Sequence, residues 1–264
     1  MRLTSRFLLL LLLATMLTLP ALAMARGIIH ASASSQIAEA FGHVILDDFK
    51  ETTGLDVNLH KFSSQMAINR LKNGVSSLAA ISIKLSTEDR KHGLVAIPIC
   101  KDPMVVVAEK SIPVQNLSLS QVRQIFSGFI TNWKDVGGPD LPIRVITPVK
   151  ETGAYANFEQ QAMGAALIRF DYEAAKSSAA VEASSFIPGA ITFATRSIVA
   201  KYDNIKMFTI DGVESSSEAY PYHQTFSFVT RGEPSGVIRE VINYAMSQEA
   251  REYMKIRGIT PLVM

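Results

Sequence analysis

Apolar positions follow two different periods along this chain, and the periods alternate. Short apolar runs are typical of buried strands, whereas Ile37, Phe41, Ile45 and Phe49 recur at the spacing of an amphipathic helix. A polar turn at 32–35 precedes that helix, with Ser34 or Ser35 as its N-cap. The pattern predicts strands at 27–30, 55–59, 78–82, 103–107, 143–146, 191–193 and 226–229. It predicts helices at 37–49, 66–72, 119–126, 154–163, 235–246 and 248–256.

Strands that alternate with helices predict an α/β fold with mainly parallel sheets. The character of the chain changes after Lys110, where a second compact α/β unit begins. The sequence contains no repeat of fixed period and no low-complexity linker. We therefore expect two halves joined by short strands or turns that act as a hinge.

The first 25 residues have the pattern of a secretory signal peptide. Arg2 and Arg6 precede an apolar run that begins at Phe7, and small residues follow Pro20. The apolar run is too short for a membrane span of about 20 residues. We expect cleavage after Ala23 or Ala25 and release of the mature chain into the periplasm.

Charge and cysteine content narrow the function further. Without Arg2 and Arg6 the basic residues would equal the 24 acidic residues, so a nucleic-acid partner, which calls for a basic face, is not expected. Cys100 is the only cysteine, so no internal disulfide is possible. It ends an apolar segment and is expected to be a small buried hydrophobic residue.

Sequence signals of catalysis and of metal binding are missing. The five histidines, His30, His43, His60, His92 and His223, have no metal-ligand spacing, and no nucleophile-elbow or phosphate-loop motif occurs. We therefore expect no enzyme activity, no metal and no cofactor. The alternating Tyr220, Tyr222, Phe226 and Phe228 are interpreted as core and hinge packing instead of a stacking platform.

Several segments together resemble the phosphate-type periplasmic substrate-binding proteins of ABC transporters. The resemblance rests on LSLSQVRQIFSG at 117–128, TNWKDVGG at 131–138, FIPGAITF at 186–193, FSFVTRGEPSG at 226–236 and GITPL at 258–262. It implies a two-lobed, type II-like periplasmic binding protein fold in which helices flank a mixed, mainly parallel sheet in each lobe. Lobe 1 would comprise 26–106 and 226–264, lobe 2 would comprise 107–225, and two strands near Val105 and Phe228 would form the hinge.

The same resemblance implies a small oxyanion bound between the lobes. Helix N-termini supply free N–H groups and a positive dipole end, and hydroxyl groups add neutral donors. Four polar turns match the family positions, and Gly153 lets the backbone approach the anion. The candidate ligand-binding residues are Ser34, Ser35, Ser63, Ser64, Ser82, Lys84, Lys150, Thr152, Gly153 and Ala154.

The chain departs from the family pattern in these turns. Pro148 stands where many relatives carry arginine, Ala154 replaces a threonine, and Glu151 adds a carboxylate. Ile83-Lys84 lies where a phosphate receptor places an aspartate that accepts the proton of monohydrogen phosphate. Phosphate is thus favoured, but rejection of fully ionised oxyanions is not assured.

The resemblance therefore predicts a monomeric receptor that captures phosphate or a related oxyanion and delivers it to an inner-membrane ABC permease. The altered turn at 148–154 leaves an alternative open: a scaffold of the same fold, with altered or lost anion binding, that serves as a sensory or adaptor protein.

Overall fold

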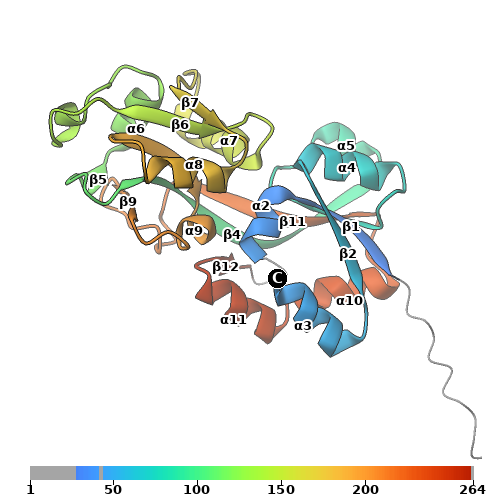
Figure 1. Ribbon diagram of the computed structural model, residues 1–264. Helices are drawn as coiled ribbons and strands as arrows, with labels where there is room; N and C mark the ends of the chain where they lie inside the picture. Colours follow the sequence, from blue (N-terminus) through green and yellow to red (C-terminus); the bar gives the residue numbers. More distant parts are fainter. Residues whose placement is uncertain (1–27, 42–43, 263–264) are drawn as a thin grey trace, which may run out of the picture.

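One curved sheet runs through both halves of the molecule and joins them (Figure 1). The computed structural model describes residues 28–41 and 44–262, so the signal segment lies outside the described residues. The sheet has ten strands, eight of them in the order β2-β1-β3-β11-β4-β8-β6-β7. The fold is the two-lobed α/β fold that the alternation of strands and helices predicts.

Lobe 1 is built on the first half of this sheet. β1 (Ile29–Ser34) lies parallel to β2 (Val57–Phe62) and β3 (Leu78–Ile81), and β11 (His223–Arg231) pairs antiparallel with β3. Its helices are α2 (Ser35–Phe41), α3 (Val44–Thr53), α4 (Ser64–Lys72), α5 (Thr87–Lys91), α10 (Gly236–Ala245) and α11 (Gln248–Ile256). β12 (Thr260–Pro261) closes the chain against β4.

Lobe 2 is built on the second half. β8 (Ala190–Thr195) and β9 (Ile205–Met207) pair antiparallel with β4 (Leu94–Glu109), and β6 (Arg144–Pro148) lies parallel to β8 and to β7 (Tyr172–Ala174). β5 (Asn116–Leu117) and β10 (Thr209–Ile210) form a separate pair. The helices are α6 (Leu119–Phe126), α7 (Gly153–Phe158), α8 (Ser177–Ser184) and α9 (Arg196–Val199), with a 3-10 turn at Trp133–Val136 and a π-helix at Glu159–Met163.

The long strand β4 passes from one lobe to the other. Its residues up to Pro103 pair with β11, whereas Met104 to Ala108 pair with β8. Met104 also donates its N–H to the Tyr222 carbonyl, just before β11 begins. The two connecting strands that the resemblance implied are therefore present. The crossing lies at Pro103–Met104 and Tyr222–His223, slightly displaced from the expected Val105 and Phe228.

The predicted helix bounds agree best with the structure where a capping residue marks the start of the helix. The helices at 119–126 and 248–256 are confirmed to the residue, and Ser118 forms a capping box with Gln121. The polar turn predicted at 32–35 is wrong, because residues up to Ser34 belong to β1 and are buried there. Small serines and alanines fit a strand covered on both faces, although they resemble a turn in sequence.

Two predicted helices end elsewhere in the structure. The stretch 37–49 covers most of α2 and the start of α3, with 42–43 between them outside the described residues, and α3 continues to Thr53. The stretch 154–163 changes from an α-helix to a π-helix at Glu159. Hydrophobic spacing alone does not distinguish these alternatives, because a helix period close to 3.6 fits each of them over such short lengths.

Aromatic contacts support the prediction that the alternating aromatic residues at 220–228 pack in the core. Phe158 stacks on Phe193 at a centroid distance of 3.9 Å in lobe 2, and Tyr222 meets Phe158 edge to face. Tyr220, Tyr222 and Phe226 are all buried, and Phe228 packs against the lobe 1 core. Cys100 is buried as predicted. The aromatic alternation therefore belongs to packing near the hinge.

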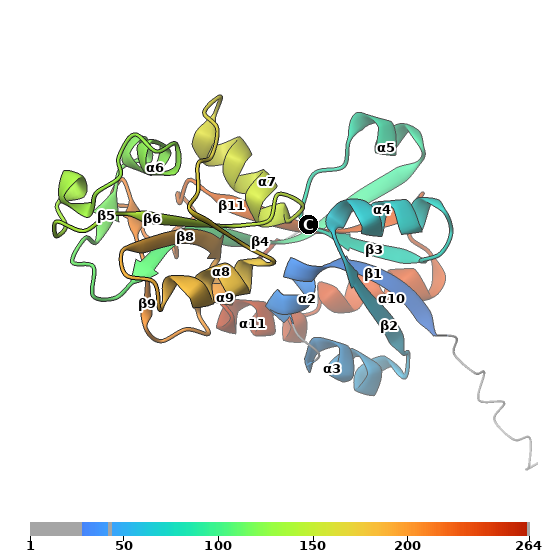
Figure 2. The ribbon, with the colours of Figure 1, turned by 45° about the horizontal axis from the view of Figure 1, so that its top comes forward.

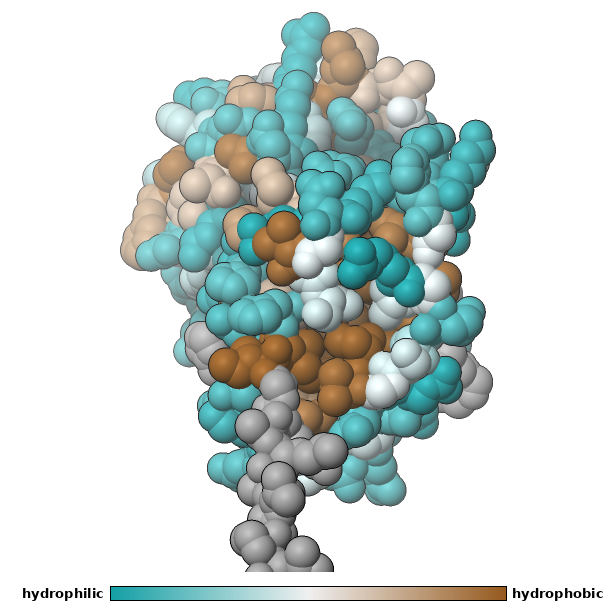
Figure 3. All heavy atoms as spheres, turned by 90° about the vertical axis from the view of Figure 1, so that its right-hand side faces the viewer, coloured by the Kyte–Doolittle hydropathy of each residue, from teal (hydrophilic) through white to brown (hydrophobic). Residues whose placement is uncertain are grey.

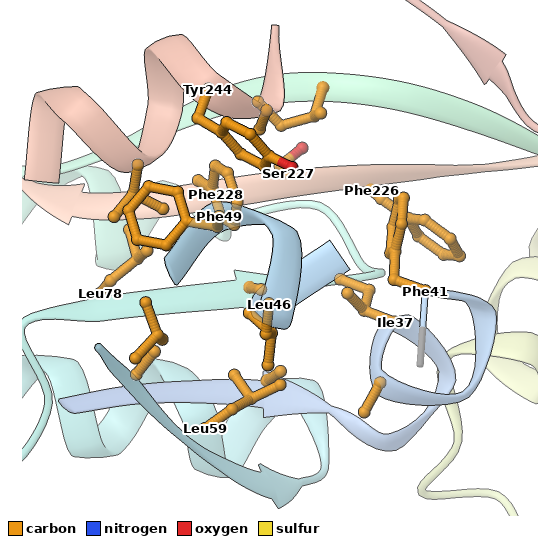
Figure 4. A pocket seen from close by; sticks show the side chains of 18 of the residues that line it. Ile37, Phe41, Leu46, Phe49, Leu59, Leu78, Phe226, Ser227, Phe228 and Tyr244 are labelled. Atoms are coloured by element: carbon orange, nitrogen blue, oxygen red, sulfur yellow. The ribbon is translucent and has the colours of Figure 1, made fainter. Parts of the chain in front are cut away.

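Lobe 1 also contains an apolar cavity of about 100 Å³ between its sheet and helices α2, α3 and α10. Ile37, Phe49, Leu59 and Phe228 are among the residues around it (Figure 4). Apolar side chains gather on the outer face of the same lobe (Figure 3). Because a dry cavity lacks van der Waals contacts on one side, lobe 1 is less tightly packed here than elsewhere.

Filling this cavity should stabilise the protein. Ala38 lies on α2 beside the cavity, and we expect Ala38→Leu to raise the free energy of unfolding by about 1 kcal/mol. The same change at Ala67, which is fully buried in the packed core under α4, should lower it by about 1–3 kcal/mol. Chemical denaturation measures the free energy of unfolding of both variants. If Ala38→Leu destabilised the protein as much as Ala67→Leu, the cavity beside Ala38 would not have room for the larger side chain.

Candidate functional site

Helices from both lobes begin close together at the centre of the molecule (Figure 2). Ser64 opens α4 in lobe 1, while Gly153 and Ser177 open α7 and α8 in lobe 2. All three residues are buried. Because the first N–H groups of a helix have no partner within the helix, such a junction needs acceptors from elsewhere.

Ser82 is the centre of a hydrogen-bonded cluster at this junction. Its N–H donates to Ser64 Oγ at 3.0 Å, and its hydroxyl donates to Gln36 Oε1 at 3.1 Å. Its carbonyl accepts from Asn157 Nδ2 at 2.8 Å. We call Gln36, Ser64, Ser82, Gly153, Asn157, Ser177 and Gln224 the interlobe cluster.

Gln36 inserts a side-chain amide between the lobes. Its Oε1 accepts from Ser82 Oγ and, at 2.9 Å, from Gln224 Nε2, while its own Nε2 donates to Ser177 Oγ at 3.5 Å. The residue is only 5% exposed although it lies near the start of α2. A single acceptor oxygen thus collects donors from a lobe 1 turn and from the hinge strand β11.

Gln224 lies on β11, directly opposite Asp102 of β4 where the chain crosses between lobes. Its Nε2 donates to Gln36 Oε1 and, at 3.0 Å, to the Ser82 carbonyl. Its Oε1 is buried and has no hydrogen-bond partner among the described residues. Buried amide oxygens are rarely left unpaired, because the lost hydration costs about 1–3 kcal/mol.

Gly153 permits the close approach of α7 to the cluster. A Cβ atom there would stand 2.6 Å from Gln36 Oε1 and 2.7 Å from Gln224 Nε2, and closer still to Ser82 Oγ. Thr152 caps the helix by accepting from Tyr155 N–H at 3.2 Å. Any side chain at position 153 would therefore push the two lobes apart.

The structure places the ten sequence-predicted residues in three groups. Ser64, Ser82 and Gly153 meet in the interlobe cluster, and Ala154 is buried beside Gly153. Ser34, Ser63 and Thr152 act as helix N-caps, accepting from Ile37, Met66 and Tyr155 respectively.

The remaining three lie away from these contacts. Ser35 is exposed and donates to the Phe62 carbonyl at 3.3 Å. Lys84 and Lys150 are exposed, and the Lys150 ammonium lies 6.0 Å from the Tyr155 ring centroid. No hydrogen bond or ion pair joins either lysine to the interlobe cluster in the described part of the chain, so their assignment as ligand contacts stays a prediction.

Sequence reasoning missed Gln36, Asn157, Ser177 and Gln224. Gln36 directly follows the predicted Ser34-Ser35 turn, so its position was a usable signal. Gln224 also carried a signal, because period-two alternation places it on the same face as Tyr222 and Phe226, which the sequence predicts to be packed in the core. A polar residue on that face was the usable sign of a buried hydrogen bond.

Lysines lie on both sides of the junction between the lobes. Burial, followed by the charges of Lys101 and Lys84, lowers the pKa of His223. Lys176 of lobe 2 pairs with Glu39 of α2 at 3.6 Å, and Lys201 Nζ donates to the Glu39 carbonyl at 2.8 Å. The two contacts with Glu39 link the lobes. The lysines also provide positive charge near the junction, although the net charge of the chain is small.

Asp102 is a buried carboxyl group at the hinge. It accepts hydrogen bonds from the Ser197 N–H at 3.3 Å and from the Ser197 hydroxyl, at the start of α9. Burial raises the pKa of Asp102 to about 7, although the bonds from Ser197 oppose the shift. Asp102 already has partners, so it is not free to bind a second group.

Two searches for other kinds of site gave no result within 28–41 and 44–262. In this range no cluster of three or more His, Cys, Asp or Glu residues has an arrangement that could hold a metal ion. No helix in the same range is long and apolar enough to cross a membrane.

Comparison with known proteins connects this geometry to one family. The model for the PBP superfamily domain matches residues 20–249. The phosphate-binding protein PstS of Bacillus subtilis is 24% identical over 193 residues, covering 68% of this chain and 64% of that protein. PstS of Borreliella burgdorferi is 26% identical over 132 residues, covering 50% of this chain and 47% of that protein. The matches thus span about half to two thirds of the length of these relatives.

Solved structures show the same fold. A crystal structure with bound phosphate, described as a phosphate ABC transporter substrate-binding protein from Clostridium perfringens, has a TM-score of 0.81 and 22% identity. It covers 90% of this chain and 100% of that chain. An ABC-type phosphate transport receptor from Vibrio cholerae has a TM-score of 0.71 and 22% identity, covering 88% and 99%.

Gly153→Ala tests the close approach of the lobes. The added methyl group would overlap Ser82 Oγ, so we expect the free energy of unfolding to fall by about 1–3 kcal/mol. Chemical denaturation measures the change. Ala156→Ser on the exposed side of α7 is the matched control and should change stability by less than about 0.5 kcal/mol. Equal stability of both variants would contradict the packed junction.

Asp102→Asn tests the buried carboxyl group. The folded-state pKa of about 7 lies above the ordinary aspartate pKa of 3.8, so between these pH values the folded protein binds more protons than the unfolded chain. Stability should therefore fall as pH rises from about 4 to about 7, by up to about 1.4 kcal/mol per pH unit. We expect Asp102→Asn to remove most of this slope in denaturation at several pH values, while the exposed Asp203→Asn retains it.

Proposed function

The chain belongs to the PBP superfamily, and we propose that it is a binding protein that captures phosphate or a related small oxyanion between its two lobes. The relatives named phosphate-binding proteins support this choice of ligand. The structural neighbour with bound phosphate supports the same choice.

The position of Gln36 Oε1 is the observation that carries the proposal. This oxygen accepts from Ser82 Oγ and Gln224 Nε2 and lies against the start of α7 at Gly153. An oxyanion oxygen requires the same kind of surroundings: convergent neutral donors and helix N-terminal N–H groups. We propose that a bound anion takes the place of the Gln36 amide when the lobes open and close again.

Neutral donors are sufficient for such a site. A hydrogen bond to a charged group contributes about 1.5–3 kcal/mol net, so several converging donors replace much of the lost hydration. The missing arginine at Pro148 and the exposed lysines are then compatible with binding. Lys101 and Lys176 would attract the anion to the junction between the lobes, and Lys84 and Lys150 stay predicted ligand contacts.

The proposed cellular role follows from the family and from the N-terminal sequence. Residues 1–25 have the pattern of a secretory signal, which supports the periplasm as the location of the mature protein. We propose that it acts there without catalysis, as a monomer, and delivers its ligand to an inner-membrane ABC permease. The phosphate-binding relatives support the phosphate ligand, and the proposed transport step rests on the role of the family.

One observation favours a second function. The Gln36 amide already satisfies the donors that an anion would use, and Pro148 replaces the family arginine. If Gln36 cannot be displaced, the protein is a two-lobed scaffold with a sensory or adaptor role. A stable protein partner in periplasmic extract, together with an empty site, would support that alternative.

Calorimetric titration of the mature protein with phosphate, arsenate, sulfate and molybdate tests the proposal. We expect phosphate to bind, and Gln36→Ala to bind it about tenfold more tightly because no internal amide must be displaced. Gln65→Ala, an exposed glutamine on α4, is the matched control and should leave the affinity unchanged. Absence of binding heat and of a thermal shift in both the wild type and Gln36→Ala would refute anion capture.

A further inference from the structure

The apolar cavity of lobe 1 adjoins a second hollow at the surface of the same lobe. The cavity has a volume of about 100 Å³ and the surface hollow one of about 380 Å³. Four residues of α2, α3 and β2 line both spaces: Ala38, Leu46, Val57 and Leu59. Figure 4 shows Leu46 and Leu59 among the side chains around the cavity. We treat the two spaces as the inner and outer parts of one lobe 1 pocket.

The inner part is almost entirely apolar. Seventeen of the nineteen residues around it have apolar side chains, and the other two are Ser227 and Tyr244. The Tyr244 hydroxyl already donates to the Asp48 carboxylate. An apolar space of this kind stays free of water, and a cavity of about 150 Å³ in another protein accepts a benzene ring. The inner part is therefore suited to a hydrocarbon group.

The outer part has polar side chains at its edge. Asp56, Asn58 and Lys61 line it. Asp56 pairs with Lys50 at 2.8 Å, whereas Lys61 forms no ion pair within the described ranges 28–41 and 44–262. The Lys61 ammonium group thus adds one unpaired positive charge beside an apolar pocket.

The position of Lys61 follows from the geometry of β2. Side chains alternate along a strand, so Val57, Leu59 and Lys61 lie on one face of β2. Val57 and Leu59 are half-buried and line both parts of the pocket, whereas Lys61 is exposed and lines the outer part alone. One face of a single strand therefore leads from apolar surface to a cation.

We propose that the lobe 1 pocket binds a carboxylate with a short hydrocarbon chain, such as hexanoate or octanoate. The chain would occupy the inner part, and the carboxylate would remain in the outer part beside Lys61, in contact with water. An inorganic oxyanion does not suit the inner part, because it would lose its hydration there without gaining donors. The pocket is separate from the interlobe cluster, so this proposal does not depend on anion capture between the lobes.

Calorimetric titration of the mature protein with butanoate, hexanoate and octanoate tests the apolar part of the pocket. Each buried methylene group should tighten binding about fourfold, so the Kd should fall about tenfold from hexanoate to octanoate. Equal affinity for the three acids would overturn the proposal. Absence of binding heat with octanoate at millimolar concentration would overturn it as well.

Ala38→Leu locates the hydrocarbon chain. Ala38 lines both parts of the pocket, and the larger side chain would occupy space that the chain needs. We expect octanoate to bind at least about tenfold more weakly, whereas Ala219→Leu, at an exposed alanine of lobe 2, should retain the wild-type Kd. If Ala38→Leu does not fold, Val57→Phe narrows the same space from β2. Undiminished octanoate binding in the folded variant would place the chain elsewhere and overturn the proposal.

Octanoate and 1-octanol together test the role of Lys61, because they share a chain length but differ in charge. An exposed ion pair of this kind changes affinity about twofold to fivefold. Lys61→Gln should therefore weaken octanoate binding by that factor and leave 1-octanol binding unchanged. Lys91→Gln, at an exposed lysine of α5, removes the same charge and should alter neither Kd.

Two further results would contradict the assignment of the carboxylate. If Lys61→Gln binds octanoate as tightly as the wild type, the carboxylate does not lie beside Lys61. If the octanoate Kd rises in proportion to added phosphate, octanoate competes for the interlobe cluster and the proposed pocket is wrong. An octanoate Kd that is unchanged by phosphate, but raised by Ala38→Leu and by Lys61→Gln, supports the proposal.

Discussion

The closed arrangement of this molecule depends on satisfying polar groups that two lobes bury between them. A polar atom withdrawn from water without a partner costs about 1–3 kcal/mol, which is a large part of the stability of a typical domain. Here Ser82, Gln36, Gln224 and Ser177 satisfy one another across the junction, and Gly153 is small enough to allow it. The lobes can meet because each contributes donors or acceptors that the other lacks.

The crossing strands make this junction adjustable. β4 and β11 join the lobes at Pro103–Met104 and His223, and the junction contacts lie directly beside them. Movement about the crossing would separate Gln36 from Ser177 without disturbing either apolar core. Asp102, bonded to Ser197 at the same crossing, ties the hinge to α9 of lobe 2. Ligand binding and lobe closure would therefore be parts of one equilibrium. A ligand shifts this equilibrium only if its affinities for the open and closed states differ.

The interlobe cluster also shows how a site can keep its geometry while its residues change. The turns at Ser64, Ser82 and Gly153 retain the positions expected from the family resemblance, but the charged residues of that pattern are missing. Two neutral glutamines now occupy the centre. An amide offers both a donor and an acceptor, so it can replace an anion oxygen in one state and contact the anion in another.

Local rules were enough to predict much of this protein from its sequence. Alternating periods predicted the α/β class and the bounds of α6 and α11, whose N-caps in the structure are Ser118 and Ser247, because periodicity and capping act within a few residues. The turns at Ser64, Ser82 and Gly153 were found through their family pattern. Tertiary structure alone decided that β4 serves both lobes, that Ser34 ends a buried strand, and that Gln36 and Gln224 meet. Those two glutamines are 188 positions apart, and no local pattern marks a contact that depends on how two lobes pack.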